Sequence, residues 1–600
     1  MKVVRLDIAN FRGIESASFK FDGHSLIIGS NNVGKSTICE ALDLVLGPDR
    51  LNKFSPIDEF DFYNGKYLAS QIDSAADLGI VTLRIEVILI ELSQEVSTKC
   101  ASHLEFWHTG QQRLLGSGEL HLANSPSCTQ CLRLETLGRY NSEEDEFEAK
   151  TYFSHSPEKA DGELSTLPRV IKRLFGFLYL RTQRTGTRAL SLERGSLLDI
   201  ILRAKGVRTT VWEKTISRLR ELDVEAEAEE LSPILRSVEK RLARYIALEG
   251  NCNATKLHAS ELTREHLRKT MTFFLAISPE QEHVPFSHVG AGTINTLVLS
   301  LLSLIADLKP DSVIFAMEEP EISVPPHTQR RIAHYLLTKT NQTFVTSHSP
   351  FVIEQFDPAS TILLTRNGGK VSARKVSDAL GLKPNDYKRF SRSGLSECML
   401  GRAAIVVEGI TEFHAMPVIA RRMEAKDPQL QPLDIAGVAF FNADGESNVL
   451  KFGTFFKTLG LKTFGFYDKL RKGTRSAKDQ ERLANNFEIN QEHAYTGFED
   501  LVVNEVPVTR LWHFLNNLDA EGQLAGGVSL PSQCPSDVEV KTFARTVLGG
   551  AKGAGLAARL FEECEFNEIP ATVVDFLSKV FTKFPLLNIE PEDEPLDIVK

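Results

Sequence analysis

Residues 25–37, SLIIGSNNVGKST, decide the fold of the first half of this chain, because an apolar run ends there in a glycine-rich turn. The turn matches GxxxxGK[ST], and the stretch STICEALDLVLG that follows has the pattern of a helix. The glycines let backbone N–H groups close around phosphates, and Lys35 would reach the outer phosphates. The Ser36 hydroxyl would bind magnesium at the N-terminus of the helix. The sequence therefore predicts a nucleotide-binding P-loop between a strand and a helix.

A P-loop needs an acid on a neighbouring strand, and SVIFAMEEPE (312–321) supplies a candidate pair. Glu318 would hold the metal, directly or through water, and Glu319 would orient or deprotonate the attacking water. VTSHSP (345–350) places His348 just beyond another strand, where an imidazole can contact a γ-phosphate. We therefore expect ATP and Mg²⁺ to bind here. The residues expected to bind ATP at the loop are Gly29, Asn31, Asn32, Gly34, Lys35, Ser36 and Thr37.

A second group of acids follows strands in the C-terminal third. In AIVVEGITEF (404–413) a branched apolar run ends in Glu408, with Glu412 four positions later. FGFYDKL (464–470) adds Asp468, and YTGFEDLVVNE (495–505) adds Glu499 and Asp500, of which Glu499 is better aligned. Clustered carboxylates raise one another's pKa unless cations neutralise them, so this group favours a metal site that could polarise a phosphodiester. The alternative for Glu408 and Glu412 is an ordinary solvated pair at a helix start.

Bulk composition limits the classes of protein that fit. Six hundred residues exceed the size of a single hydrophobic core, so we expect two or three domains. No apolar run reaches the roughly 18 residues of a membrane span, and the first residues lack the features of a secretory signal. We therefore expect a soluble, cytoplasmic protein without membrane contact. The net charge of −10 counts against nucleic-acid binding, although the basic stretch 169–188 could line a groove rather than being solvated surface.

The pattern along the chain predicts an α/β fold with a helical insertion. Strands dominate residues 51–160, and between 207 and 275 apolar residues recur on one helix face, which suggests either a satellite bundle or a dimerisation surface. We expect ATPase parts at 1–206 and 276–385 around this insertion, and a second α/β domain with a C-terminal helical region at 398–600. Cys128 and Cys131 lack a second CxxC, so they favour structural thiols over a zinc site.

Four motifs carry a resemblance: NFRG (10–13), GSNNVGKST (29–37), EEPE (318–321) and TSHSP (346–350). Over most of residues 1–375 they resemble the ABC-type ATPases of the SMC and overcoming-lysogenization-defect (OLD) group. The resemblance implies that a Ser/Gly signature of one subunit caps the nucleotide of another, so hydrolysis would require a dimer. FSHVGAGTINTL (286–297) is the candidate, through Ser287, Gly290 and Gly292, although it departs from a plain Ser-Gly-Gly signature. Gln183 is a candidate Q-loop residue.

The segment VVEGITE (406–412) resembles the first motif of Toprim domains, which OLD nucleases join to an ABC ATPase in this order. The resemblance implies a Toprim (Rossmann-like) domain, and NADGESN (442–448) resembles its Gly-x-Ser-Asn turn, through Gly445, Ser447 and Asn448. It also implies that Lys552 stabilises charge on the scissile phosphate. Leu470 departs from the family's Asp-x-Asp pattern, and a missing ligand would weaken one metal. The implied metal ligands are Ser36, Glu318, Glu408, Glu412, Asp468 and Glu499, and the implied catalytic side chains are Glu319, His348, Glu408, Glu412, Asp468 and Lys552.

For function, the resemblance implies an ATP-regulated, divalent-metal-dependent DNA endonuclease, a homodimer or larger, in bacterial defence against phage or foreign DNA. It implies Mg²⁺, with Mn²⁺ or Ca²⁺ as alternatives at the nuclease site, and a helicase-like partner protein. The alternative, prompted by Leu470, is a non-catalytic ATP-dependent DNA clamp or sensor with a decayed Toprim site. A topoisomerase would need a tyrosine nucleophile on a companion domain, and no segment suits that role.

Overall fold

The computed structural model describes residues 1–48, 56–68, 71, 80–159, 162–181, 196–220, 231–242, 271, 273–276, 282–308, 313–379, 384–390, 394–470 and 474–586. Its contacts divide the chain into two compact units. The first unit comprises residues 1–4, 42–58 and 86–344, and the second comprises residues 5–41, 59–85 and 345–600. No described helix is long and apolar enough to cross a membrane.

The first unit contains a parallel strand pair and an antiparallel region. β10 (Phe177–Leu180) pairs in parallel with β13 (Ile314–Glu318), whose five residues are all buried. The long β7 (Cys128–Asn141) pairs with β5 (Leu104–His108) and β8 (Glu146–Phe153), all antiparallel, as expected for a strand-rich region. The helices α10 (Ala291–Leu308) and α11 (Pro326–Lys339) flank β13 in sequence. β13 thus carries the predicted acids to the end of a buried strand.

Part of the predicted helical insertion lies in the described residues. α6 (Arg208–Arg220) and α8 (Leu231–Leu242) are helical, and Ile234 and Val238 of α8 are exposed. Residues 243–270 of the predicted insertion lie outside the described residues. Phe274 and Leu275, at the end of the span, instead form β11 and pair antiparallel with β12 (Val284–Pro285).

The N-terminal part of the second unit builds the P-loop. β3 (Ser25–Ile28) is completely buried, as expected for an unbroken apolar strand, and pairs in parallel with β15 (Thr361–Asn367). β15 pairs antiparallel with β16 (Lys370–Lys375), and α1 (Lys35–Leu46) begins directly after the loop. The strand, loop and helix predicted from residues 25–47 are therefore present.

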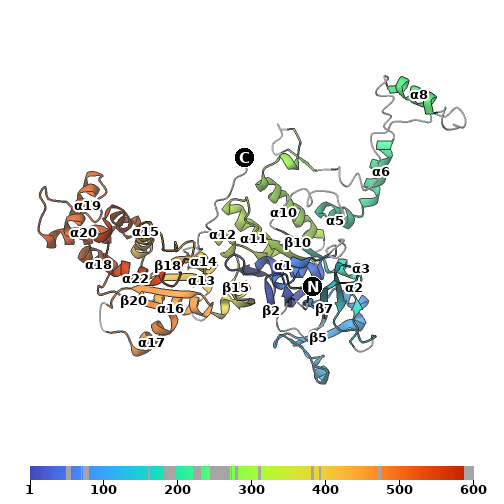
Figure 1. Ribbon diagram of the computed structural model, residues 1–600, viewed down its shortest axis with the longest axis horizontal. Coiled ribbons are helices and arrows are strands. Elements are labelled where there is room, and N and C mark those ends of the chain that lie inside the picture. The colour runs from blue at the N-terminus through green and yellow to red at the C-terminus, as the bar shows by residue number, and fades with distance from the viewer. Residues whose placement is uncertain are drawn as a thin grey trace. The chain divides into compact units, whose positions relative to one another are not determined.

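The C-terminal part of the second unit is a parallel sheet with the strand order β18-β17-β19-β20. The strands are β17 (Ala403–Val407), β18 (Val438–Asn442), β19 (Lys462–Tyr467) and β20 (Ile489–Glu492). From β17 the chain crosses through α15 (Ile410–Lys426) to β18 and returns through α16 (Glu446–Thr458) to β19. Because such crossovers are right-handed, the reversal puts α15 and α16 on opposite faces of the sheet (Figure 1). Loops after β17 and β19 thus meet at a topological switch point, where ligands of parallel sheets bind.

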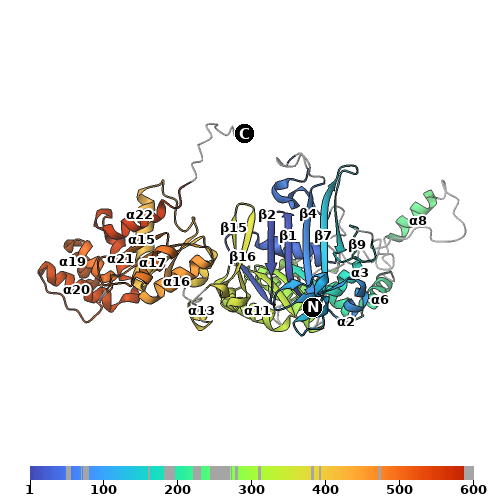
Figure 2. The ribbon, with the colours of Figure 1, turned by 90° about the horizontal axis from the view of Figure 1, so that it is seen from below.

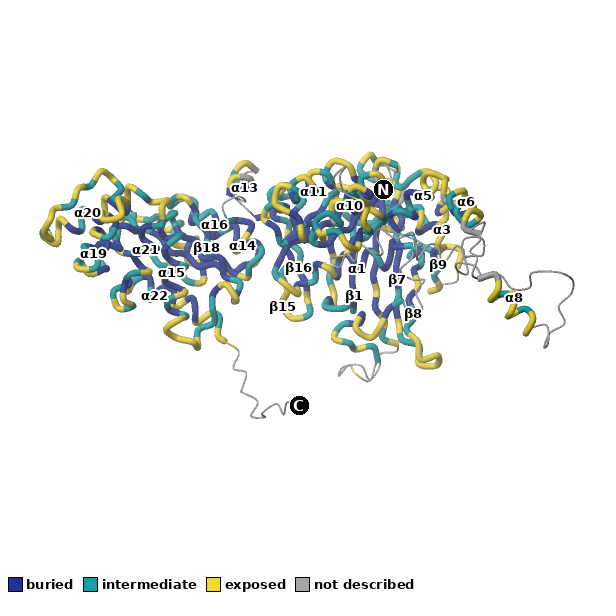
Figure 3. Tube along the Cα trace, turned by 90° about the horizontal axis from the view of Figure 1, so that it is seen from above, coloured by how far each residue is buried: buried dark blue, intermediate teal, exposed yellow. Residues whose placement is uncertain are grey.

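Helices close this sheet on its remaining sides. α17 (Ala477–Asn486) packs against α16, and α18 (Phe498–Glu505) follows β20. The C-terminal helices α19 (Val508–Ala520), α20 (Asp537–Gly550), α21 (Leu556–Glu563) and α22 (Ala571–Phe581) form a cluster (Figure 2) that shares one core with β17 and α15. In Figure 3 the strands are buried and the outer helix faces are exposed.

Candidate functional site

The acids predicted after β17 and β19 meet at one edge of the C-terminal sheet. The two strands are parallel neighbours with Val407 opposite Phe466, so the residues that follow them emerge side by side. Glu408 Oε2 accepts a hydrogen bond from the backbone N–H of Asp468 at 3.1 Å. Two residues sixty positions apart are therefore in direct contact.

Glu412 lies in the first turn of α15 and is only 3% exposed. Its carboxylate folds back over Gly409: a Cβ added to Gly409 would come within 2.9 Å of Glu412 Oε2. The backbone of Gly409 has an ordinary extended conformation, so glycine is needed here for space and not for its φ angle. The glycine between the two glutamates thus lets the second carboxylate enter the cluster.

Glu499 completes the group from the first turn of α18. A Cβ added to Gly497 would lie 3.5 Å from Glu499 Oε2 and 4.0 Å from Asp468 Oδ2, so both carboxylates face the same small space. The Thr411 hydroxyl donates to Glu499 Oε1 at 2.9 Å, and Lys552 Nζ lies 3.2 Å from the same oxygen. Lys552 is thus brought to the cluster.

Burial and mutual repulsion govern the protonation of this group. Burial, followed by the charges of Asp468, Glu499 and Glu408, raises the pKa of Glu412 to about 8. Burial, followed by the charge of Asp468, also raises the pKa of Glu408. In the metal-free protein, bound protons reduce the repulsion among these acids. A cation could replace those protons.

Mg²⁺ prefers oxygen ligands and usually binds through one or two carboxylates, with waters and phosphate oxygens completing its octahedron. Within the described residues, no group of three or more His, Cys, Asp or Glu is arranged so that it could hold a metal ion by itself. The all-oxygen donors of Glu408, Asp468, Glu412 and Glu499 fit the chemistry of such a partly hydrated cation, although they do not enclose it.

A residue that the sequence reasoning missed, His493, lies against Asp468. It follows β20 directly, and its completely buried side chain places Nε2 2.7 Å from Asp468 Oδ1, although the geometry of this contact is not that of a hydrogen bond. The N–H of Tyr495 donates to Nδ1 at 3.3 Å, so in the neutral ring the proton sits on Nε2, facing the carboxylate. The feature of the sequence that could have indicated His493 is its position directly after β20. This strand lies beside β19, with Glu492 paired to Tyr467.

Arg475 was also missed. Its side chain is only 6% exposed; Nη2 donates to the carbonyl of Asp468 at 3.0 Å, and Nη1 lies 2.8 Å from Glu446 Oε1. Its guanidinium also stacks on the ring of Tyr467, at 4.6 Å from the centroid. Arg475 therefore ties the loop after β19 to α16, which no local sequence pattern indicated.

The remaining predicted residues of this domain surround the cluster. Gly445 has φ +123° and precedes α16, and the Asn448 side chain donates to the carbonyl of Ala443 at 3.0 Å, so both shape the turn after β18. Ser447 lies in the first turn of α16. Asp500 turns to Arg545, at 2.5 Å, and not to the cluster.

In the P-loop of the second unit, Lys35 forms hydrogen bonds with the backbone of the loop itself. Lys35 is buried, and its Nζ donates to the carbonyls of Gly29 and Ser30 at 3.0 and 2.8 Å. Gly29 has φ +144°, and a Cβ there would lie 2.6 Å from the carbonyl oxygen of Leu364, so this position requires glycine. Ser36 is exposed in the first turn of α1. A bound phosphate could replace these two carbonyls as the acceptor of the Lys35 ammonium. The loop is therefore arranged as a phosphate-binding loop requires.

Other predicted nucleotide contacts lie around this loop. Asn31 and Asn32 are exposed, Gly34 has φ +108°, and Thr37 is buried. Burial and the charge of Lys35 lower the pKa of His348, so its imidazole is neutral near pH 7. A neutral ring can donate one hydrogen bond to a phosphate oxygen.

The predicted acids and the signature lie in the first unit. Glu318 is buried at the end of β13 and accepts a hydrogen bond from the Tyr179 hydroxyl at 2.7 Å. Glu319 has φ +43°, a left-handed conformation that is strained for a non-glycine residue and is common at functional sites. Ser287 and Gly290 are exposed before α10, whereas Gly292 packs so closely that a Cβ would lie 2.6 Å from the Ser323 carbonyl oxygen.

Three further residues that the sequence singled out are Gln183, Cys128 and Cys131. Gln183 lies outside the described residues. Cys128 and Cys131 are three positions apart on β7, which directs their side chains to opposite faces of the sheet, and burial raises the pKa of Cys131 to about 12. They are free thiols and do not form a metal-binding pair with each other.

Comparison with known proteins identifies both domains. The family described as AAA ATPase domain matches residues 1–77 and 90–353, more than half of the chain. The family described as overcoming lysogenization defect protein-like, TOPRIM domain, matches residues 399–469. A search of curated proteins found no match. The predicted α/β class and the order of ATPase domain, Toprim domain and C-terminal helices are confirmed.

Similar solved structures include SMC heads. A SmcHead bound to the C-winged helix domain of ScpA is 11% identical with a TM-score of 0.34, covering 63% of this chain and 100% of that chain. A Pyrococcus furiosus Smc head with an extended coiled coil, bound to the C-terminal domain of ScpA, is 12% identical with a TM-score of 0.34, covering 63% and 97%. The SMC head domain from Thermotoga maritima is 12% identical with a TM-score of 0.27, covering 62% and 99%. On the two family matches, this chain belongs to the AAA ATPase domain family and is an OLD-like fusion of that ATPase domain to a Toprim domain.

Proposed function

We propose that this protein is an ATP-regulated, divalent-metal-dependent DNA endonuclease. The observation that carries the proposal is the convergence of Glu408, Glu412, Asp468 and Glu499 from three segments at the switch point of the Toprim sheet. A cation held there by Glu408 and Asp468, with Glu412 and Glu499 beside them, would polarise a phosphodiester and activate water. The Toprim family match supports a nuclease-type activity.

Lys552 and His493 have supporting roles in this proposal. The Lys552 side chain is 54% exposed and lies 3.2 Å from Glu499, so its ammonium can turn toward a scissile phosphate and stabilise the developing charge. His493 Nε2 lies 2.7 Å from Asp468 Oδ1, whereas Asp468 Oδ2 lies on the side of Glu499, where the cation would bind. One oxygen of the ligand is thus restrained while the other remains available.

The ATPase domain would control assembly or access. Lys35 and Ser36 would bind the phosphates and Mg²⁺, with Glu318 as the second metal residue, Glu319 acting on the attacking water and His348 at the γ-phosphate. The exposed Ser287 and Gly290 suit contact with the nucleotide of a second copy, which supports a homodimer or larger assembly. Defence against foreign DNA, with a helicase-like partner, is proposed on the family resemblance alone.

Nicking of supercoiled plasmid in Mg²⁺ or Mn²⁺ tests the nuclease. We expect Glu408→Ala to abolish nicking while phosphate release from ATP continues. Asp500→Asn is the matched control, because this neighbouring acid pairs with Arg545 and should leave nicking intact. Wild-type rates of nicking by Glu408→Ala would remove Glu408 from the site.

The second candidate is a DNA clamp or sensor whose Toprim site has decayed, and the observation in its favour is Leu470. It predicts no nicking by the wild-type protein in either metal, under conditions in which ATP is hydrolysed. The same plasmid assay therefore decides between the two candidates.

A further inference from the structure

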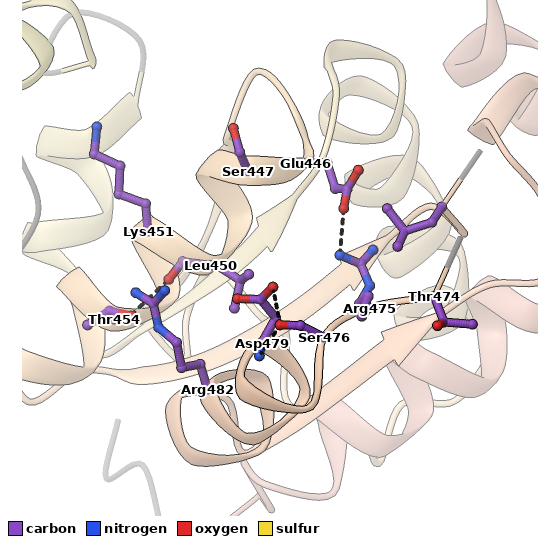
Figure 4. Close-up of a pocket in the computed structure, with 11 residues that line it drawn as sticks. Glu446, Ser447, Leu450, Lys451, Thr454, Thr474, Arg475, Ser476, Asp479 and Arg482 are labelled. Atoms are coloured by element: carbon purple, nitrogen blue, oxygen red, sulfur yellow. Dashed lines mark hydrogen bonds and ion pairs between the residues drawn. The ribbon is translucent and has the colours of Figure 1, made fainter. Parts of the chain in front are cut away.

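A cavity of about 460 Å³ lies beside the acidic cluster, within the Toprim domain (Figure 4). Its walls come from α16, the loop after β19, and α17. Glu446 and Arg475 form the wall nearest to the cluster, since Arg475 Nη2 donates to the Asp468 carbonyl at 3.0 Å. Whatever enters this cavity is therefore close to the proposed reaction centre.

The charges that line the cavity are mostly engaged within the protein. Glu446 lies 2.8 Å from Arg475, and Lys451 extends toward Asp386, at 2.6 Å. The Asp479 carboxylate accepts a hydrogen bond from the Ser476 hydroxyl at 2.7 Å.

Arg482 differs from these residues. It is exposed, and the described part of the chain provides no ion pair for it. In Figure 4 its side chain extends across the cavity toward Thr454, on the neighbouring helix. The Thr454 hydroxyl itself donates to the carbonyl of Leu450 at 2.9 Å and accepts from Asn486 at 2.8 Å. The cation that the cavity offers to a phosphate group is therefore the Arg482 guanidinium.

Leu470 also lines this cavity, and this placement gives the departure from the Toprim pattern a physical meaning. An aspartate at this position would add a negative charge to the cavity wall beside Glu446 and Asp479. Leucine adds no charge at this position. Compared with an aspartate, it therefore avoids additional repulsion of a bound anion, and it also provides no ligand for a cation.

We propose that this cavity binds a phosphate of the DNA backbone next to the phosphodiester that is cleaved, with Arg482 as its cation and Leu470 as the residue that adds no further negative charge to the wall. The proposal rests on the proposed nuclease function. Leu470 then marks a site changed from cation binding to anion binding, and not a decayed one.

Binding of a fluorescein-labelled DNA duplex in EDTA, without nucleotide, isolates this contact from metal binding and cleavage. We expect Arg482→Gln to raise the Kd roughly tenfold and to lower the slope of log Kd against log salt by about one, as loss of one phosphate contact requires. Arg421→Gln is the control, because Arg421 is also an exposed arginine but belongs to α15 and lies outside the cavity. The Kd of this variant should equal the wild-type value.

Leu470→Asp separates the proposal from a decayed metal site. We expect it to raise the Kd for DNA in EDTA at least as much as Arg482→Gln, whereas Leu470→Asn, which adds polarity without charge, should weaken binding less. A decayed metal site predicts the opposite pattern: Leu470→Asp would bind DNA normally and bind Mn²⁺ more tightly than the wild-type protein.

Wild-type Kd values and salt slopes for both Arg482→Gln and Leu470→Asp would overturn the phosphate cavity. If Leu470→Asp fails to fold, the Kd and salt slope of Arg482→Gln still test the proposal, because Arg482 is exposed. Failure of the nuclease function gives a different result, namely no plasmid nicking by a wild-type protein whose DNA binding still depends on Arg482.

Discussion

Binding of a divalent cation at the Toprim site is expected to displace a proton from Glu412. With its pKa raised to about 8 by burial and by Asp468, Glu499 and Glu408, this carboxyl is protonated at neutral pH. It should be ionised in roughly one-tenth of molecules at pH 7 and about one-hundredth at pH 6. The apparent affinity for Mn²⁺ should therefore rise roughly tenfold per pH unit from 6 to 7 and level off above pH 8 to 9.

The same proton affects stability. Because the folded pKa of Glu412 lies above the usual value of 4.5, the folded protein holds the proton more tightly than the unfolded chain. The contribution of Glu412 to metal-free stability should therefore be greatest at low pH and fall by about 1.4 kcal/mol per pH unit between the two pKa values, until pH exceeds about 8. Bound metal should reduce this loss, since it replaces the proton.

Isothermal titration of the nucleotide-free protein with MnCl₂, at pH 6, 7, 8 and 9 and in two buffers of different ionisation enthalpy, measures affinity and proton release together. The wild-type protein should release about one proton per ion at pH 7 from Glu412. Glu412→Gln, which keeps the buried side chain neutral, should lose the steep dependence between pH 7 and 8, and Asp500→Asn should keep it. Because the pKa of Glu408 is raised too, the contribution of Glu412 is obtained from the difference in pH dependence between Glu412→Gln and the wild-type protein. Wild-type pH dependence in Glu412→Gln would refute the reasoning.

Three further predictions concern other sites. Glu319→Gln should still bind ATP but release phosphate at least about 100-fold more slowly, because it removes the group that acts on water; an unchanged rate would remove Glu319 from that role. His493→Ala should weaken Mn²⁺ binding roughly 10- to 100-fold by freeing Asp468, with ATP hydrolysis unchanged and partial recovery in His493→Gln; full-strength Mn²⁺ binding would contradict the positioning role. Burial lowers the pKa of Lys172 to about 7, although the nearby Asp43 acts to raise it. The buried charge of Lys172 therefore destabilises the folded protein fully below pH 7, and this destabilisation disappears as the pH rises toward 10.5. Thermal unfolding should show stability rising across that range in the wild-type protein and a flatter profile in Lys172→Met; identical profiles would show that Lys172 is not the cause.

Much of both candidate sites could be predicted from local patterns. Lys35 and Ser36 follow an apolar strand and open a helix, and the phosphate loop is built from consecutive residues, so sequence spacing alone describes it. Glu408 and Asp468 each end a buried strand, and parallel strands present their carboxyl ends at one edge. Their meeting could therefore be anticipated from the strands that carry them.

Other features depended on which elements became neighbours in space. His493 contacts Asp468 because β20 was added beside β19, and strand order is set by packing of the whole sheet and not by any one segment. The cavity wall formed by Leu470 and Arg482 likewise exists only because α17 packs against α16. Short-range periodicity encoded the strands, the P-loop and the acids at strand ends, since those depend on adjacent residues. The pairing of distant side chains, their burial and their altered pKa values depend on long-range packing, which no single stretch of sequence contains.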